Sequence, residues 1–173
     1  MPTIPERIPP SVKLGSHYDS VIYAILMQEQ TTSDDPLWFN PLNRGTVMGF
    51  GLPSWQREVV WSTAQQVSFI ESVWRGIPLG TYTYNSVVHE NPRYRGLLID
   101  GLQRLHAIEW YVMHDAFRVF DLLYSELTKI EQRRFVMTKF CSYEFDSADE
   151  KELRAYYNLM NFGGTPHKEN ERA

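Results

Sequence analysis

The residues best suited to chemistry lie where an apolar run at 97–99 meets Asp100-Gly101 and a helical pattern begins at once. A strand that ends in a tight turn and feeds a helix leaves the first helical amides unpaired, at the positive end of the dipole. Such a turn binds anions, most usefully phosphate. Arg104 could bind a phosphate oxygen bidentately and Gln103 could donate another hydrogen bond, while Asp100 could hold a metal ion or accept a proton. The alternative is that Asp100 only caps the helix and Arg104 is a surface residue, because aspartate is common at N-caps.

A second polar group, Gln56-Arg57-Glu58, stands between Trp55 and Trp61. Three consecutive polar residues bracketed by tryptophans indicate an edge that faces a cleft. In such a cleft Arg57 would suit a phosphate clamp, and Glu58 would suit a general base or a metal ligand. An exposed bend with the tryptophans packed beneath it explains the pattern equally well.

A third segment ends a helix at Asn161, close to the pair Gly163-Gly164. Consecutive glycines let a backbone approach a ligand closely, although they also serve simply to end a helix. A phosphate loop of the G-x-x-x-x-G-K-[ST] type is absent from the sequence. The glycines alone therefore favour a helix stop.

The histidines and the single cysteine, Cys141, form no metal-binding motif in the sequence. None of the five histidines belongs to an H-E-x-x-H pattern, and one cysteine excludes both an internal disulfide and a multi-cysteine zinc site. Cys141 stands among apolar and aromatic residues, where an inert core thiol is expected. His106 would come within reach of the Asp100 turn, although a satisfied, partly buried histidine explains it more simply.

Composition predicts one packed domain with a reducing, cytoplasmic location. The chain has 173 residues, of which 43% are hydrophobic, and its net charge is -4. Such a charge gives no general attraction to nucleic acid or to anionic membranes, so DNA binding would need a local basic patch. The N-terminus has no apolar signal segment, and no run reaches the roughly 18 apolar residues of a membrane helix. The candidates for a DNA-facing patch are Arg93 and Arg95, and a second group of Lys129, Arg133 and Arg134 that a solvated helix face also explains.

Short strands interspersed with helices predict an α+β (mixed α/β) fold. The expected organisation is an N-terminal extension with one helix at 1–45 and a compact nucleotide-binding domain at 46–173. Apolar spacing, caps and Gly/Pro stops predict helices at 18–30, 62–75, 103–113, 125–138 and 147–162. Aromatic and β-branched content predicts strands at 46–55 (with a break), 81–88, 97–99 and 139–145.

Four segments in this order resemble the N-terminal domain of GmrSD-type modification-dependent restriction proteins, a member of the ParB/sulfiredoxin-like superfamily. The segments are LPSWQREVVW, SFIESVWRGIPLGTYTYN, LLIDGLQRLHAI and YYNLMNFGGTPH. They extend from about Leu52 to His167. The resemblance implies a compact fold that binds ATP or another nucleoside triphosphate, with phosphates at the D-G-x-x-R turn.

Carried over position by position, the resemblance implies a nucleotide site in this chain. Leu102, His106 and Glu58 differ from what is frequent in the family, and Glu58 adds a carboxylate near the proposed phosphates. The predicted catalytic residues are Asp100, Glu58 and Arg104, and Asp100 would also be a ligand of Mg²⁺. The predicted nucleotide and phosphate ligands are Gln56, Arg57, Gly101, Leu102, Gln103, Arg104, His106, Asn161 and Gly164.

Three functions fit this site. The first is a phosphotransferase that uses a triphosphate and Mg²⁺ in DNA modification, for example on the hydroxyl of a hydroxymethylated base in phage-type DNA. The second is a triphosphate-hydrolysing subunit of a restriction system that needs a separate nuclease, and the third is a nucleotide-gated DNA adaptor. Glu58 and the expected lack of an H-N-H-type nuclease domain favour the first. Sulfiredoxin chemistry is disfavoured, because no cysteine stands beside the phosphate turn.

Overall fold

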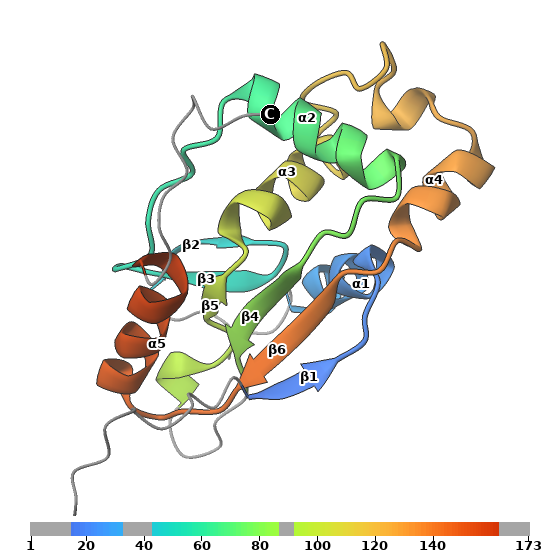
Figure 1. Ribbon diagram of the computed structural model, residues 1–173. Coiled ribbons are helices and arrows are strands. Elements are labelled where there is room, and N and C mark those ends of the chain that lie inside the picture. The colour runs from blue at the N-terminus through green and yellow to red at the C-terminus, as the bar shows by residue number, and fades with distance from the viewer. Residues whose placement is uncertain (1–14, 33–42, 87–91, 163–173) are drawn as a thin grey trace, which may run out of the picture.

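The computed structural model describes residues 15–32, 43–86 and 92–162, which form the predicted α+β fold (Figure 1). The helices are α1 (Ile22–Thr32), α2 (Thr63–Trp74), α3 (Leu102–Val112), α4 (Lys129–Val136) and α5 (Glu150–Phe162), with 3₁₀ turns η2 (Pro92–Tyr94) and η3 (Tyr124–Glu126). The strands are β1 (Ser16–Tyr18), β2 (Asn43–Val47), β3 (Phe50–Pro53), β4 (Thr81–Asn85), β5 (Leu98–Asp100) and β6 (Cys141–Phe145). None of the described helices is long and apolar enough to cross a membrane.

The main sheet has the strand order β1-β6-β4-β5 and is mixed. The central pair β4–β6 is parallel, whereas β1–β6 and β4–β5 are antiparallel. The hairpin β2–β3 lies beside it and is joined to it by a bridge between Gly51 and Leu97. The strand before the Asp100 turn is therefore held by β4 on one edge and lies next to the hairpin.

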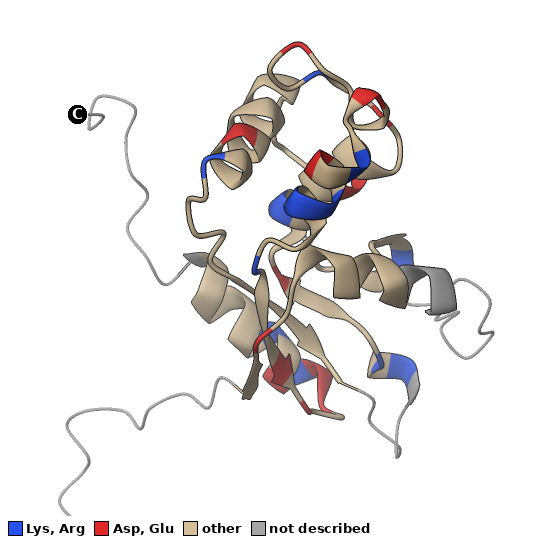
Figure 2. Cartoon of the chain, turned by 90° about the vertical axis from the view of Figure 1, so that its right-hand side faces the viewer, with Lys and Arg blue, Asp and Glu red and all other residues tan. Residues whose placement is uncertain are grey.

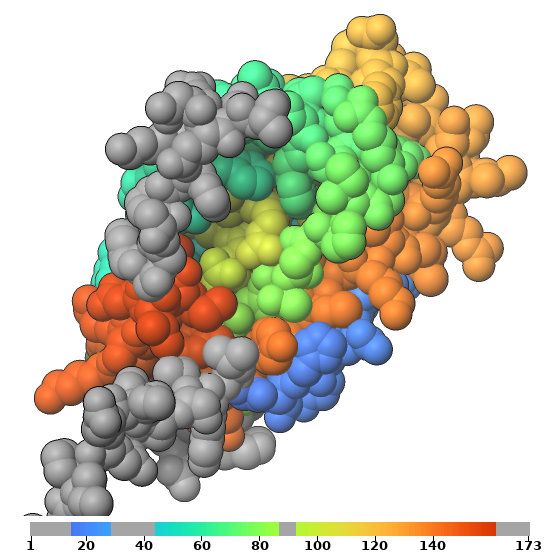
Figure 3. Space-filling view, viewed as in Figure 1, coloured from blue at the N-terminus to red at the C-terminus, as the bar shows by residue number. Residues whose placement is uncertain are grey.

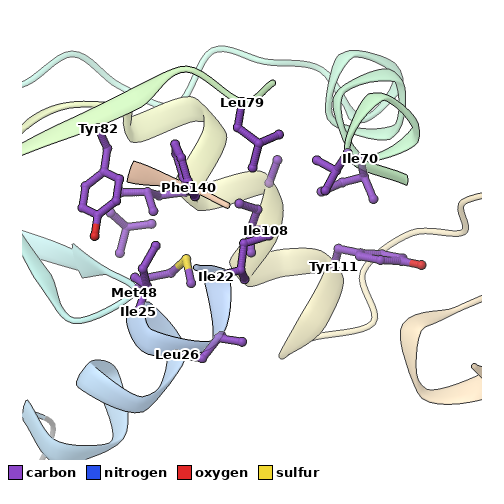
Figure 4. Packing of buried hydrophobic residues seen from close by; sticks show 14 of the residues in the cluster. Ile22, Ile25, Leu26, Met48, Ile70, Leu79, Tyr82, Ile108, Tyr111 and Phe140 are labelled. Carbon is purple, nitrogen blue, oxygen red and sulfur yellow. The ribbon is translucent and has the colours of Figure 1, made fainter. Parts of the chain in front are cut away.

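Two apolar cores lie on opposite faces of the main sheet, because successive side chains of a strand point to opposite sides. Leu98 belongs to the larger core with α1, α2 and α3, whereas Ile99 belongs to the smaller core under α5. Figure 4 shows side chains from several elements meeting in the larger core, among them Ile22, Ile108 and Phe140. The sheet thus fixes the position of Asp100, the residue that follows Ile99.

The N-terminal part of the chain contributes to the same core. Ile22 and Ile25 of α1 are buried in it, although both belong to the predicted extension at 1–45. The prediction of a helix from residue 18 is wrong at its start, since residues 16–18 form β1 and pair with β6. Sequence periodicity did not indicate this strand, because its partner lies far along the chain.

The starts of α2 and α4 carry local capping signals, although α4 is shorter than the predicted helix at 125–138 because residues 124–126 form the separate turn η3. Ser62 and Gln65 form a capping box at the start of α2, and Thr128 caps α4 in the same way. The capping box expected at Ser147 does not start α5, which begins at Glu150. The Ser147 hydroxyl instead accepts a hydrogen bond from the Asp149 amide and donates one to the Glu152 carboxylate.

Candidate functional site

The turn between β5 and α3 leaves the first amides of α3 without a side-chain cap. Gly101 is the N-cap residue, has φ of 100°, and offers no side chain to those amides. Asp100 is one residue too early to be the cap, so the interpretation of Asp100 as a simple helix cap is wrong. Figure 3 shows α3 (yellow-green) at the floor of a hollow between α2 (green) and α5 (orange-red). The start of α3 is therefore uncapped and positively polarised, and α3 lines a recess.

Arg104 lies in the first turn of α3 and is fixed on three sides. One nitrogen donates to the Leu79 carbonyl at 2.8 Å, and another pairs with the Asp100 carboxylate at 3.0 Å. The guanidinium also lies over the Phe140 ring, 5.8 Å from its centroid. The side chains of Arg104 and Asp100 are only 23% and 22% exposed. Arg104 is thus no ordinary surface residue, and its planar fork is held beside the uncapped amides.

Two glycines make room for this arrangement. A Cβ at Gly101 would lie 2.6 Å from the Tyr82 Cβ, and a Cβ at Gly80 would lie 2.8 Å from an Arg104 nitrogen. Both glycines also have positive φ values, which favour glycine over other residues. The close packing of the turn against β4 therefore depends on residues without side chains.

Gln103 holds the polar segment that precedes α2. Its side-chain oxygen accepts from the amides of Val60 and Trp61 at 3.0 and 3.1 Å, and its nitrogen donates to the Glu58 carbonyl at 2.9 Å. The residue is 3% exposed. The structure thus brings the Gln56-Arg57-Glu58 segment and the Asp100 turn together. The side chain of Gln103 bonds to backbone groups of the protein, and its predicted role as a phosphate ligand stays a prediction.

We expect Gln103→Leu to lower the free energy of unfolding by about 2 kcal/mol, because two partly buried amides and one carbonyl lose their partner. Chemical denaturation measures this loss. Gln65→Ala is the matched control: within the described part of the chain the Gln65 side chain bonds to the exposed Ser62 cap alone, so the cost should be below about 1 kcal/mol. Equal losses for the two variants would contradict the positioning role of Gln103.

Gln56 makes a similar connection to β5. Its side-chain nitrogen donates to the Leu98 carbonyl at 3.1 Å, its oxygen accepts from the Arg57 amide, and the residue is 4% exposed. The Arg57 amide also donates to the Tyr157 hydroxyl of α5. The Gln56-Arg57 segment therefore ties β5, the α2 lead-in and α5 together at one edge of the recess.

Glu58 and Arg57 are exposed on the outer side of this segment. The Glu58 side chain is 80% exposed and pairs with Arg44, which also donates to the Arg57 carbonyl. The Arg57 side chain points into solvent rather than into the core. Both side chains stand next to a segment that Gln103 anchors to the Asp100 turn, and their assigned roles stay predictions.

The remaining predicted ligands lie at different depths. Leu102 is buried, so only its backbone can face a ligand. His106 stacks on Trp110 with ring centroids 4.9 Å apart, and burial, reinforced by His114, lowers its pKa. Asn161 donates to the Tyr157 carbonyl near the end of α5. Gly164 lies outside the described residues.

Sequence reasoning missed two buried hydroxyls beside Asp100. Thr83 is the cross-strand partner of Asp100, and its buried hydroxyl faces the buried Tyr156 hydroxyl of α5. Neither hydroxyl has another hydrogen-bond partner within the described part of the chain. Burial raises the pKa of Tyr156, the contact with the Thr83 hydroxyl lowers it, and the negative charge of Asp100 raises it. A neutral phenol donor is thus held near the carboxylate, a feature that no local motif encodes.

Asp100 offers limited support for the predicted Mg²⁺. Mg²⁺ is commonly held by one or two carboxylates together with substrate phosphates, and Asp100 supplies one such carboxylate. Arg104 already neutralises it, and within residues 15–32, 43–86 and 92–162 no cluster of three ligand side chains includes Asp100. Asp100 therefore fits Mg²⁺ only as a partial ligand shared with a bound nucleotide.

The basic residues do not form one patch on the face shown in Figure 2. Lysine and arginine appear there in small groups separated by acidic residues. On α4, Arg134 lies over the Trp74 ring and contacts its carbonyl. The predicted DNA-facing patch on α4 stays a prediction, because the distribution of charge does not distinguish this surface from the rest of the face shown.

Comparison with known families gives one match that covers most of the chain. Residues 38–172 match the family model described as "GmrSD restriction endonuclease, N-terminal domain". Searches of curated proteins and of solved structures found no significant match. The wider ParB/sulfiredoxin-like placement stays a prediction. The matched region includes the turn at Asp100, Arg104 and the segment at 56–61. Because the match covers most of the chain, the chain belongs to the family of GmrSD restriction endonuclease N-terminal domains.

Proposed function

We propose that this chain binds a nucleoside triphosphate at the start of α3 and hydrolyses it as a component of a modification-dependent restriction system that acts on DNA. The observation that carries the proposal is the uncapped start of α3 at Gly101, next to the half-buried pair of Arg104 and Asp100. Unpaired amides and a fixed guanidinium are the groups that bind phosphate oxygens. The family description, which names a restriction endonuclease, supports the biological setting.

In this proposal the backbone holds the phosphates and the side chains set the charge. The amides that follow Gly101 bind oxygens of the terminal phosphates, and Arg104 stabilises the charge that develops during transfer. Asp100 orients Arg104 through their ion pair and is the nearest carboxylate for positioning the attacking water. A bound Mg²⁺ would neutralise phosphate charge, with Asp100 as its protein ligand.

A phosphotransferase uses the same phosphate site and differs only in the acceptor. The observation that favours it is the exposed Glu58 carboxylate, which lies on the segment that Gln103 fastens to the phosphate turn. Glu58 could orient an acceptor hydroxyl at the edge of the recess, such as that of a hydroxymethylated base. A flipped or single-stranded base would be needed to reach it.

One experiment separates these functions. The protein is incubated with Mg²⁺ and γ-labelled triphosphates, with either plain or hydroxymethylated DNA. Release of free phosphate supports hydrolysis, and label on DNA supports the phosphotransferase. Retention of the triphosphate without turnover supports a nucleotide-gated adaptor. Failure to bind any triphosphate would overturn the phosphate site itself.

Asp100→Asn is expected to lower turnover at least 100-fold while triphosphate binding falls much less, because the amide keeps the shape of the carboxylate but loses its charge and basicity. Single-turnover hydrolysis and equilibrium binding measure the two effects. Asp146→Asn is the control, since Asp146 is exposed at the far end of β6. An Asp100→Asn variant with full turnover would remove Asp100 from the mechanism.

A further inference from the structure

A second group of chemically capable side chains lies on strands β1 and β6, away from the turn at α3. His17, Asp19 and Cys141 each offer one ligand atom, and these atoms all lie within 4.8 Å of one another. The Cys141 sulfur also contacts the Asp19 carboxylate at 3.3 Å. Cys141 is half-buried and lies outside the apolar cores, so the expected core position is wrong, while the expectation that the thiol is inert stays a prediction.

Strand pairing explains why residues 122 positions apart in the chain meet here. In the antiparallel register Tyr18 faces Ser142, so the next pair outward is Asp19 and Cys141. His17 lies two residues before Asp19, and residues two apart in a strand project from the same face. The three side chains therefore converge by the geometry of the sheet itself, which makes their arrangement reproducible from molecule to molecule.

We propose that His17, Asp19 and Cys141 form a binding site for a divalent transition-metal ion of the zinc type. Imidazole nitrogen, carboxylate oxygen and thiolate sulfur are the three ligand types that zinc takes in proteins. Three protein ligands leave the fourth tetrahedral position for water or another small ligand. The hard ions Mg²⁺ and Ca²⁺ prefer oxygen ligands and are disfavoured by this set.

The observed spacing is close to what a tetrahedral ion needs. Ordinary zinc–sulfur and zinc–oxygen bond lengths place the two ligand atoms about 3.6 Å apart at the tetrahedral angle. The Cys141 sulfur and the Asp19 oxygen are 3.3 Å apart. Asp19 is exposed, so its side chain can rotate to close the remaining distance. Metal binding requires little adjustment beyond loss of the thiol proton to solvent.

A neighbouring aromatic ring helps to orient the histidine. The Tyr143 ring lies 5.1 Å from the His17 ring, tilted by 60°. Tyr143 is also the cross-strand partner of His17. A histidine whose ring packs against another ring loses less conformational entropy when it binds a metal ion. The contact with Tyr143 therefore favours metal binding by His17.

The single cysteine makes the proposal directly testable. Cys141 is the only thiol in the chain, so its reaction with an aromatic disulfide reagent reports on this site alone. We expect Zn²⁺ to slow the reaction of the unaltered protein at least tenfold, because the metal-bound sulfur is no longer a free nucleophile. Co²⁺ should give the absorption bands of a cobalt–thiolate bond, and Cys141→Ser should abolish them.

Variants of the other two ligands decide whether the site is built as proposed. His17→Ala and Asp19→Asn should each weaken Zn²⁺ binding at least roughly 10–100-fold. Loss of a residue that only hydrogen-bonds a metal ligand already costs that much affinity, and loss of the ligand itself should cost no less. The control is His114→Ala, an exposed histidine beyond the end of α3, which should keep the protection. Circular dichroism confirms the fold of each variant. Absence of protection in the unaltered protein, or unchanged protection in His17→Ala, would overturn the proposal.

A rise in melting temperature gives a second readout. Metal that binds the folded state stabilises it by mass action, so Zn²⁺ should raise the melting temperature of the unaltered protein. The same addition should have little effect on His17→Ala or Cys141→Ser. A rise of equal size in all three proteins would show that the ion acts elsewhere, and would count against the site.

Discussion

Arg104→Lys is expected to weaken nucleoside triphosphate binding roughly 10–100-fold, the equivalent of one lost charge-assisted hydrogen bond. Lysine keeps the positive charge but has a single nitrogen with three donors, so bonds to the Leu79 carbonyl and the Asp100 carboxylate would leave at most one donor for a phosphate and no planar fork. Its ammonium would also lose the flat contact with Phe140. Isothermal titration of the protein with a slowly hydrolysed triphosphate analogue measures the change.

Arg134→Lys is the matched control for this variant. Arg134 also lies over an aromatic ring, 5.9 Å from the Trp74 centroid, and also contacts a backbone carbonyl. It belongs to the end of α4 rather than to the turn before α3. Triphosphate affinity should not change there. If Arg104→Lys binds the analogue as tightly as Arg134→Lys, the start of α3 is not the phosphate site.

Gly101→Ala should destabilise the protein by about 3 kcal/mol, through a strained backbone conformation and a steric clash together. The added Cβ would lie 2.6 Å from the Tyr82 Cβ and 3.2 Å from its Cα, and neither atom is the end of a flexible side chain. β4 and the turn would have to separate. For a chain of this size the melting temperature should fall by about 10 °C, which differential scanning calorimetry detects.

Gly76→Ala separates the two causes. Gly76 also has a left-handed conformation, with φ of 75°, but nothing lies within 4 Å of the position of its Cβ. Alanine there should cost only about 1 kcal/mol, from the backbone conformation alone. The difference between the two variants measures the clash with Tyr82. Equal losses of stability in the two variants would mean that the turn at Gly101 does not pack closely against Tyr82 of β4.

The sequence predicted those parts of the fold that local chemistry determines. The helix expected at 103–113 is α3, displaced by one residue, because a turn signal and an apolar period coincide there. β1 was missed because its only evidence is pairing with β6, more than 120 residues away. Ser147 misled the prediction of α5, because its hydroxyl found other partners than the expected box.

The candidate site divides along the same line. The turn at Asp100 and the place of Arg104 in the first turn of the next helix could be predicted, since residue type and spacing carry that information. The partners of Gln103 could not, because a glutamine that binds phosphate and one that binds backbone amides look alike in sequence. The buried hydroxyls of Thr83 and Tyr156 are brought to Asp100 by strand register and helix packing, which are long-range properties.

The three hydrogen bonds of Gln103 join the first turn of α3 rigidly to residues 58–61, which precede α2. Val60 and Trp61 cannot leave their places without breaking bonds to α3, and Ser62, the cap of α2, follows directly. A ligand that rigidifies one helix start therefore damps the fluctuations of the other.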